Sequence, residues 1–328
     1  MKTADHVLLT GAGFTHNFGA PLAVDMWSLL LGHSLIRRMS RIRRILLENF
    51  DFESAYDQVI LSTEYSEEEK AAMHNAVAAV YNSLDDGLRG WNSRLGAPYP
   101  VNLYGVRRLM EKFGGTRGSP GLFFTLNQDL FIERYYADGP TLQLPGLDRA
   151  VHLPSRAQGM LDLENRIVLP ATLPSIDDSV QRDTFFYVKL HGSCNWYASD
   201  GRQRMVIGHG KADQIAKEPL LTAYLDLFRR VLASGNKRLL VIGYGFRDTH
   251  INCAIADAIR QGTLELFVVS PQQASYFRKS LEEVPHGTDI WPGLHGYYPQ
   301  TLRAIFPQNQ EETQEWRHLR CNFFSEGA

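Results

Sequence analysis

Four short clusters of polar or glycine residues each follow an apolar run of the sequence. If the fold brings the ends of these runs together, the clusters could form one site. The clusters are Gly11-Ala12-Gly13, Asn127-Gln128-Asp129, His191-Gly192-Ser193 and Gly243-Tyr244-Gly245. Glycines in a turn let the backbone approach a pyrophosphate, and a histidine can serve as a general base near neutral pH. An amide and a carboxylate can hold a sugar hydroxyl or a water molecule. These residue types together favour chemistry on a nucleotide.

Each cluster also has a structural interpretation. Gly11 and Gly13 would suit a tight strand–helix connection without a ligand, and Asn127 belongs to a residue type that caps helices well. A lone histidine such as His191 is more often structural than catalytic. His250, beyond the last cluster, could simply face solvent or a neighbouring chain. The occurrence of four clusters at equivalent places is stronger evidence than any one of them.

The elements that must position the clusters alternate between buried strands and helices. Strands are expected at 6–10, 122–126 and 167–169, and within "FFYVKL", "RLLVI" and "LELFVV". This alternation predicts a Rossmann-like parallel α/β sheet. Ligands of such sheets bind outside the carboxyl ends of the strands. The four clusters should therefore meet at one edge of the sheet.

A long helical block interrupts this alternation after the first strand. Residues 22–95 show apolar side chains at helical spacing, and Ser66 before three glutamates is a good N-cap. We therefore expect one domain, with an α/β core of residues 1–21 and 96–328 and an all-helical insertion of residues 22–95.

The first turn does not fit a redox dinucleotide site. Such a site needs a third glycine, where this chain has His16, and a second strand that ends in an acid about 20 residues further on. The segment "LGHSLIRRMSRIRR" occupies that region, and its pattern is helical and basic. Its residues Arg37 to Arg44 could bind nucleic acid or an acidic partner, but a solvated or subunit-facing helix side is the preferred interpretation.

Composition sets further bounds. The net charge is −2, which does not favour nucleic-acid binding. The three cysteines are far apart and form no C-x-x-C, so we expect no four-cysteine zinc site, no other metal and no disulfide framework. No apolar run approaches about 18 residues, and no leader is evident, so a cytoplasmic protein is expected.

The motifs resemble those of the sirtuins and occur in the same order along the chain. Gly11-Ala12-Gly13-Phe14-Thr15 followed by Gly19-Ala20-Pro21 is similar to the sirtuin glycine turn, and Asn127-Gln128-Asp129 and Leu190-His191-Gly192 match the sirtuin Asn-x-Asp and catalytic Leu-His-Gly. The zinc module is absent, and Leu22-Ala23-Val24 replaces the sirtuin Asp-Phe-Arg. "FTLNQDLFIE", "KLHGSCNW" and "GYGFRDTHIN" look more like the sirtuin-like domains of bacterial antiphage systems.

The resemblance implies an NAD+ hydrolase that releases nicotinamide and ADP-ribose, with no metal. It implies catalytic roles for Asn127, which would hold the attacking water and a ribose hydroxyl, for His191 as base, and for Asp129 on the ribose side. The implied NAD-binding residues are Gly11, Ala12, Gly13, Phe14, Thr15, Asn17, Asp25, Gly243, Tyr244, Gly245 and Ser270.

The resemblance and the length of the chain also imply an antiphage effector that acts as an oligomer. They suggest a partner on a separate chain, such as a HerA-type hexameric ATPase. Two alternatives remain open at this stage. One is an NAD-dependent protein deacylase, and the other is a regulatory subunit that binds NAD or ADP-ribose without turnover.

Overall fold

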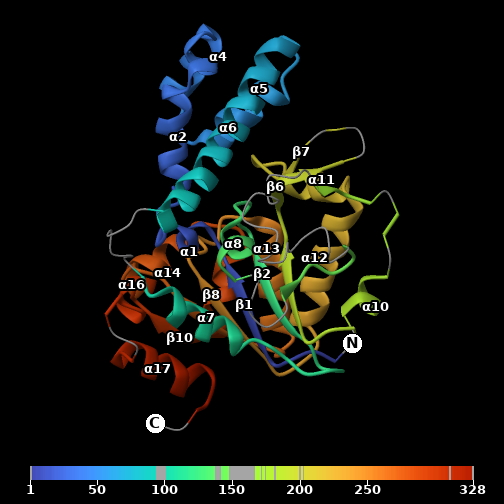
Figure 1. Ribbon diagram of the computed structural model, residues 1–328, viewed down its shortest axis with the longest axis vertical. Helices are drawn as coiled ribbons and strands as arrows, with labels where there is room; N and C mark the ends of the chain where they lie inside the picture. The colour runs from blue at the N-terminus through green and yellow to red at the C-terminus, as the bar shows by residue number, and fades with distance from the viewer. Residues whose placement is uncertain are drawn as a thin grey trace.

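A parallel β-sheet forms the centre of the computed structural model (Figure 1). The structure describes residues 2–93, 101–136, 142–147, 167–170, 172–173, 175–180, 182–198, 201, 203–309 and 312–326. Among these residues, seven strands lie in the order β10-β9-β8-β1-β2-β5-β3, and every pairing is parallel. The strands are β1 (His6–Thr10), β2 (Gly121–Thr125), β3 (Leu142–Gln143), β5 (Phe185–Lys189), β8 (Lys237–Ile242), β9 (Leu264–Val269) and β10 (Leu294–Tyr298). The predicted Rossmann-like α/β fold is confirmed.

The central strands are continuous apolar runs because helices cover both faces of the sheet. In β1, Leu8 pairs with Leu240 of β8 on one side and with Phe123 of β2 on the other. From β1 the chain first builds the β2 side of the sheet and then crosses to β8. The switch point of the topology therefore lies between β1 and β8, where such folds bind ligands.

Helices of the second half of the chain pack against this sheet. α12 (Pro219–Leu232) contacts β5 and β8, and α13 (Thr249–Arg260) contacts β9 and α12. α14 (Ala274–Glu282) follows β9, and α17 (Gln314–Phe323) contacts β10. The apolar faces of these helices and the sheet share one core, which fixes the strand ends that carry the four clusters.

The stretch predicted to be helical contains, from Ala23 to Ser93, the helices α2 (Ala23–Gly32), α3 (Ser34–Arg37), α4 (Ser40–Glu48), α5 (Phe52–Ile60) and α6 (Glu67–Ser93). We call these five helices the helical module. Figure 1 shows it rising from the side of the core on which α1 (Ala12–His16) lies. Ser66 caps α6 as predicted, because its hydroxyl accepts a hydrogen bond from the Glu69 N–H. The division into core and insertion stays a prediction.

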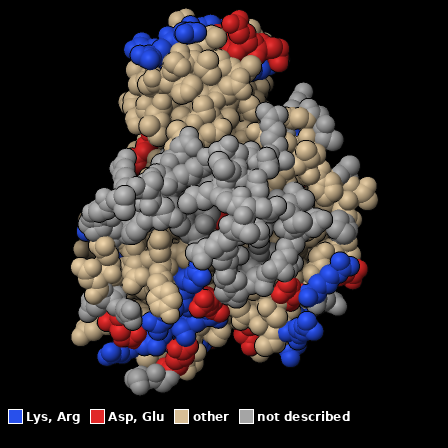
Figure 2. All heavy atoms as spheres, viewed as in Figure 1, with Lys and Arg blue, Asp and Glu red and all other residues tan. Residues whose placement is uncertain are grey.

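The module has an apolar core of its own that reaches the α/β part. Leu130, Cys194, Met205 and Ile207 belong to the same cluster as the buried side chains of the module. The end of the module opposite the sheet is charged (Figure 2). It exposes Arg37, Arg38, Arg43 and Arg44, and also Glu64, Glu67 and Glu68. Arg41 is paired with Glu69, so part of this basic segment has a local partner.

Four strands were not predicted from the sequence, namely β3, β6, β7 and β10. β6 (Gly192–Tyr197) follows His191 directly and forms a small sheet with β4 (Ile167–Val168) and β7 (Gln203–Met205). β10 has a mixed sequence, LHGYY, and a register shift next to β9. None of the helices in the described part of the chain is both long and apolar enough to cross a bilayer.

Candidate active site

The turn after β1 packs against the end of β8. α1 (Ala12–His16) begins at once, and the Gly11 and Gly13 N–H groups donate to the carbonyls of Ile242 and Gly243 at 3.1 and 2.8 Å. A Cβ on Gly11 would come within 2.8 Å of the Gly243 oxygen, and one on Gly13 within 2.8 Å of the Gly243 Cα. Both glycines are therefore needed for contact between two strand ends. Since their N–H groups are occupied, any pyrophosphate would have to be held by other groups.

The Gly243 cluster completes this contact. Gly243 has φ of +68°, and a Cβ there would lie 2.2 Å from the Phe14 nitrogen. Tyr244 is buried, and its hydroxyl donates to Asn252 Oδ1 at 3.0 Å and accepts the Asp248 N–H at 3.0 Å. The cluster thus fixes the start of α13 against the end of β1.

Asn127 is held at the carboxyl ends of β1 and β2 by threonines. Thr10 Oγ1 donates to Thr125 Oγ1 at 2.8 Å, and Thr125 Oγ1 accepts the Asn127 N–H at 3.1 Å. The Asn127 side chain donates from Nδ2 to Thr15 Oγ1 at 3.3 Å. Asn127 does not cap the next helix, α8 (Phe131–Tyr136), because Asp129 Oδ1 accepts the Phe131 N–H at 3.0 Å instead.

Asp129 lies in a buried charged group. Burial raises the pKa of its carboxyl, while the Lys189 charge and a hydrogen bond from Thr15 oppose that rise. Lys189 Nζ donates to the Asp129 carbonyl at 2.6 Å and to Glu133 Oε1 at 2.8 Å. The Lys189 and Glu133 side chains are 0% and 4% exposed, so they form a buried ion pair. This pair fixes the backbone that carries Asp129.

Replacement of Glu133 by leucine should lower the free energy of unfolding by about 3–5 kcal/mol, because the buried Lys189 ammonium loses its counter-charge. The double variant Lys189→Met, Glu133→Leu should recover part of that loss, since it removes both charges of the pair but also takes the Lys189 charge away from the buried Asp129 carboxyl. Urea unfolding of the three proteins measures both values. A single variant as stable as the parent would show that the ion pair is not what stabilises this part of the core.

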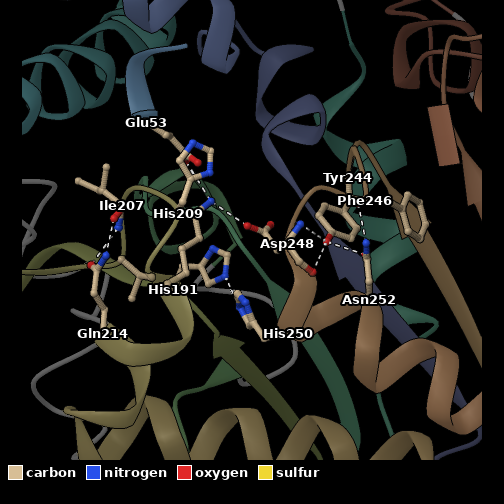
Figure 3. Close-up of polar contacts among 12 residues, drawn as sticks. Glu53, His191, Ile207, His209, Gln214, Tyr244, Phe246, Asp248, His250 and Asn252 are labelled. Carbon is tan, nitrogen blue, oxygen red and sulfur yellow. Dashed lines mark hydrogen bonds and ion pairs between the residues drawn. The ribbon is translucent and has the colours of Figure 1, made fainter. Parts of the chain in front are cut away.

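His191 faces a second histidine. The Nε2 atoms of His191 and His250 lie 2.9 Å apart, although the two residues are 59 positions apart in the chain (Figure 3). Burial lowers the pKa of His191 to about 3 and that of His250 to about 4, against an opposing effect of the Asp248 carboxylate. Both rings are therefore neutral at neutral pH, and one nitrogen of the contact must donate to the other.

A three-member charge network supports this pair from the helical module. In α11 (Lys211–Ala216), Lys211 Nζ lies 2.7 Å from Asp248 Oδ1 and 3.0 Å from Glu53 Oε1 on α5. Burial raises the pKa of Glu53. Burial would also raise the pKa of Asp248, but the nearby His191 and Lys211 outweigh it and lower that pKa. The network ties α5 to the start of α13, where His250 stands.

The neighbouring strands bring these groups to one edge of the sheet. The Leu190 N–H donates to the Thr125 carbonyl. The Val206 N–H donates to the His191 carbonyl, and the Val206 carbonyl accepts from the Gln128 side chain.

The SIR2-like domain family model matches residues 121–285, half of the chain. This chain belongs to the SIR2-like family. Such domains bind NAD+ and are generally NAD-dependent enzymes. A search of curated proteins found no match.

The family match covers Asn127, Asp129, His191 and the Gly243 cluster, and the fold alone adds the Gly11 turn to them. Among the described residues, no group of three or more His, Cys, Asp and Glu side chains could hold a metal ion. The family and the parallel topology thus support NAD-related activity at the carboxyl ends of the strands.

Some predicted NAD-binding residues have local partners. Asn17 Nδ2 donates to the Gly13 carbonyl at 2.7 Å, and Asp25 Oδ2 accepts the Leu22 N–H at 2.8 Å at the start of α2. Ser270 follows β9, and its N–H donates to the Tyr298 carbonyl. The assignment of these residues, and of Ala12, Phe14 and Gly245, to NAD+ stays a prediction.

The sequence did not reveal which residues surround His191 in the folded protein. His250 stood out in the sequence, but only the fold places it against His191. Lys211 and Glu53 gave no signal, because they lie on helices from distant parts of the chain and meet Asp248 only in the folded protein. Asp248 is the N-cap residue of α13, but its carboxylate binds Lys211 and makes no side-chain cap.

Proposed function

We propose that this chain hydrolyses NAD+ to nicotinamide and ADP-ribose. The observation that carries the proposal is the placement of a neutral, buried histidine, His191, and an amide, Asn127, after neighbouring strands of a SIR2-like sheet. The reaction breaks the bond between ribose C1′ and the nicotinamide nitrogen. The electron pair of that bond stays with nicotinamide, and water adds to C1′ with loss of one proton.

The residues present fit such a substrate. Asn127 and the Thr15 hydroxyl supply neutral donors and acceptors for ribose hydroxyls at the ends of β1 and β2. The switch point between β1 and β8, where a dinucleotide binds in folds of this type, lies beside them. With the Gly11 and Gly13 N–H groups occupied, the remaining groups of α1 are the candidates for the pyrophosphate.

Each catalytic residue has a role that its surroundings support. Asn127, fixed through Thr15 and Thr125, would hold the attacking water and a ribose hydroxyl. His191 would accept the proton, since burial keeps the ring neutral and leaves one of its nitrogens unprotonated. Asp129 would stabilise positive charge on the ribose side, although burial raises the pKa of its carboxyl.

The wider role is proposed on the resemblance of the motifs. The chain would act in the cytoplasm as the NAD-depleting effector of a bacterial antiphage system and cause abortive infection. It would work as a homo-oligomer with a separate partner such as a HerA-type ATPase. The lack of C-x-x-C pairs for a zinc module favours hydrolysis over deacylation.

Incubation of the purified chain with NAD+ tests the proposal, alone and with its neighbour-encoded partner. We expect nicotinamide and ADP-ribose in equal amounts without any peptide. Nicotinamide release that requires an acyl-lysine peptide would identify a deacylase instead. Binding of NAD+ or ADP-ribose without turnover, with and without the partner, would identify a regulatory subunit.

A further inference from the structure

We infer that His250 is a positioning residue, whose Nε2 accepts a hydrogen bond from His191 Nε2–H and so leaves His191 Nδ1 as the nitrogen that takes the proton. The inference rests on the proposed hydrolysis, because it assigns the form of His191 that can act as the base there. Nothing in the family match identifies a second histidine.

The contact admits two arrangements. Two ring nitrogens 2.9 Å apart need one proton between them, which either His191 or His250 donates. If His250 donates, the His191 proton is on Nδ1, and neither of its nitrogens can accept another without breaking the contact. If His191 donates, its Nδ1 is unprotonated and can act as a base. The second arrangement is therefore the productive one.

Burial makes the tautomer of His191 depend on its contact with His250. His191 is 3% and His250 8% exposed, so water cannot readily replace either ring as a partner. Because burial holds the pKa of His191 to about 3 and that of His250 to about 4, the pair carries no extra proton near neutral pH. The tautomer of His191 then depends on its neighbour, because the hydrogen bond made by one ring nitrogen of a histidine sets which nitrogen carries the proton.

Charged groups on three elements face the pair. Asp248 at the start of α13 raises the pKa of both rings, while Lys211 of α11 lowers both, and Arg229 of α12 lowers that of His250. Lys211 binds the Asp248 carboxylate at 2.7 Å and is itself shared with Glu53. One oxygen of the Asp248 carboxylate is thus bound to Lys211, and the hydrogen-bond partner of His191 is a neutral imidazole.

The test compares two replacements of His250. His250→Met fills a similar volume but is only a weak acceptor, whereas the side-chain oxygen of His250→Gln can accept from His191 Nε2–H. We expect kcat for NAD+ hydrolysis to fall about 10- to 100-fold in the methionine variant, at or below the lower end of the roughly 10²–10⁴-fold contribution of a general base, with KM unchanged. The glutamine variant should restore most of kcat.

Two readouts separate positioning from a loss of structure. In the methionine variant the acid limb of kcat should move to higher pH, because removal of His250 removes an effect that lowers the pKa of His191. Ring-nitrogen NMR of ¹⁵N-histidine protein should show His191 protonated on Nε2 in the parent and in His250→Gln. Thermal unfolding of each variant checks the fold.

Full kcat in His250→Met, or a parent in which His191 carries its proton on Nδ1, would overturn the inference and leave the proposed hydrolysis standing. Absence of NAD+ turnover in the parent would refute the proposed function instead. The NMR measurement needs no substrate, so it would still decide whether His250 fixes the tautomer of His191.

Discussion

Turnover of NAD+ should fall about 10²–10⁴-fold when His191 is replaced by alanine, because the proton released by the attacking water loses its acceptor. Asn127→Ala should also abolish most nicotinamide release, since the water and the ribose hydroxyl lose the amide that Thr15 and Thr125 hold in place. Initial rates of nicotinamide formation, measured over a range of NAD+ concentrations, give kcat and KM for each variant.

The effects of these two substitutions should not multiply. Residues that act as one unit lose nearly all of their contribution when either is removed, so the double variant should resemble the worse single variant. His318→Ala is a matched control, because this exposed histidine lies on α17, against Tyr298 of β10. Turnover retained in both single variants, with His318→Ala also active, would contradict the catalytic assignment.

Much of the fold could be predicted because most of its strands appear in the sequence as local apolar patterns. β1, β2, β8 and β9 are apolar runs that end near glycine or polar turns, and parallel strands buried on both faces need such runs. β10 lacked this signal, because its glycine and exposed His295 interrupt the pattern. The order of strands depends on long-range pairing, which no local pattern reports.

The position of the candidate site at the strand ends could be predicted from the sequence, but the contacts between its residues could not. The rule that polar clusters follow strand ends brought Asn127, Asp129 and His191 to one edge of the sheet. It could not show that Gly11 and Gly13 are needed for packing against Gly243, because a glycine that meets protein backbone looks the same in sequence as one that meets phosphate. The Asp25 carboxylate, by contrast, caps α2 as its position in the first turn allows.

Acid should destabilise the protein through the same histidine pair. The unfolded rings have a pKa of 6.5, whereas burial lowers the pKa of folded His191 to about 3 and that of folded His250 to about 4. Below pH 6.5 the unfolded chain therefore binds protons that the folded protein cannot, and the free energy of unfolding falls as pH falls. At about 1.4 kcal/mol per pH unit and group, the pair should remove roughly 4–6 kcal/mol by pH 4.

Other groups titrate with different signs, so the comparison must be between variants. Glu53 and Asp129 have raised pKa values, and their protonation in the folded state offsets part of the loss as pH falls. Asp248 has a lowered pKa, so its contribution is lost only below its ordinary value of 3.8. Urea unfolding between about pH 7 and pH 4 should give a shallower decrease for His191→Phe, His250→Met than for the parent.

For the single variant His250→Met, the decrease in the free energy of unfolding with falling pH should lie between those of the parent and the double variant. This variant removes one of the two groups that the unfolded state protonates. Its slope against pH should be lower than that of the parent over the window from 6.5 down to about 4. Equal slopes in parent and double variant would mean that both rings become charged in the folded protein. That result would also remove the physical basis for a neutral His191 held ready to accept a proton.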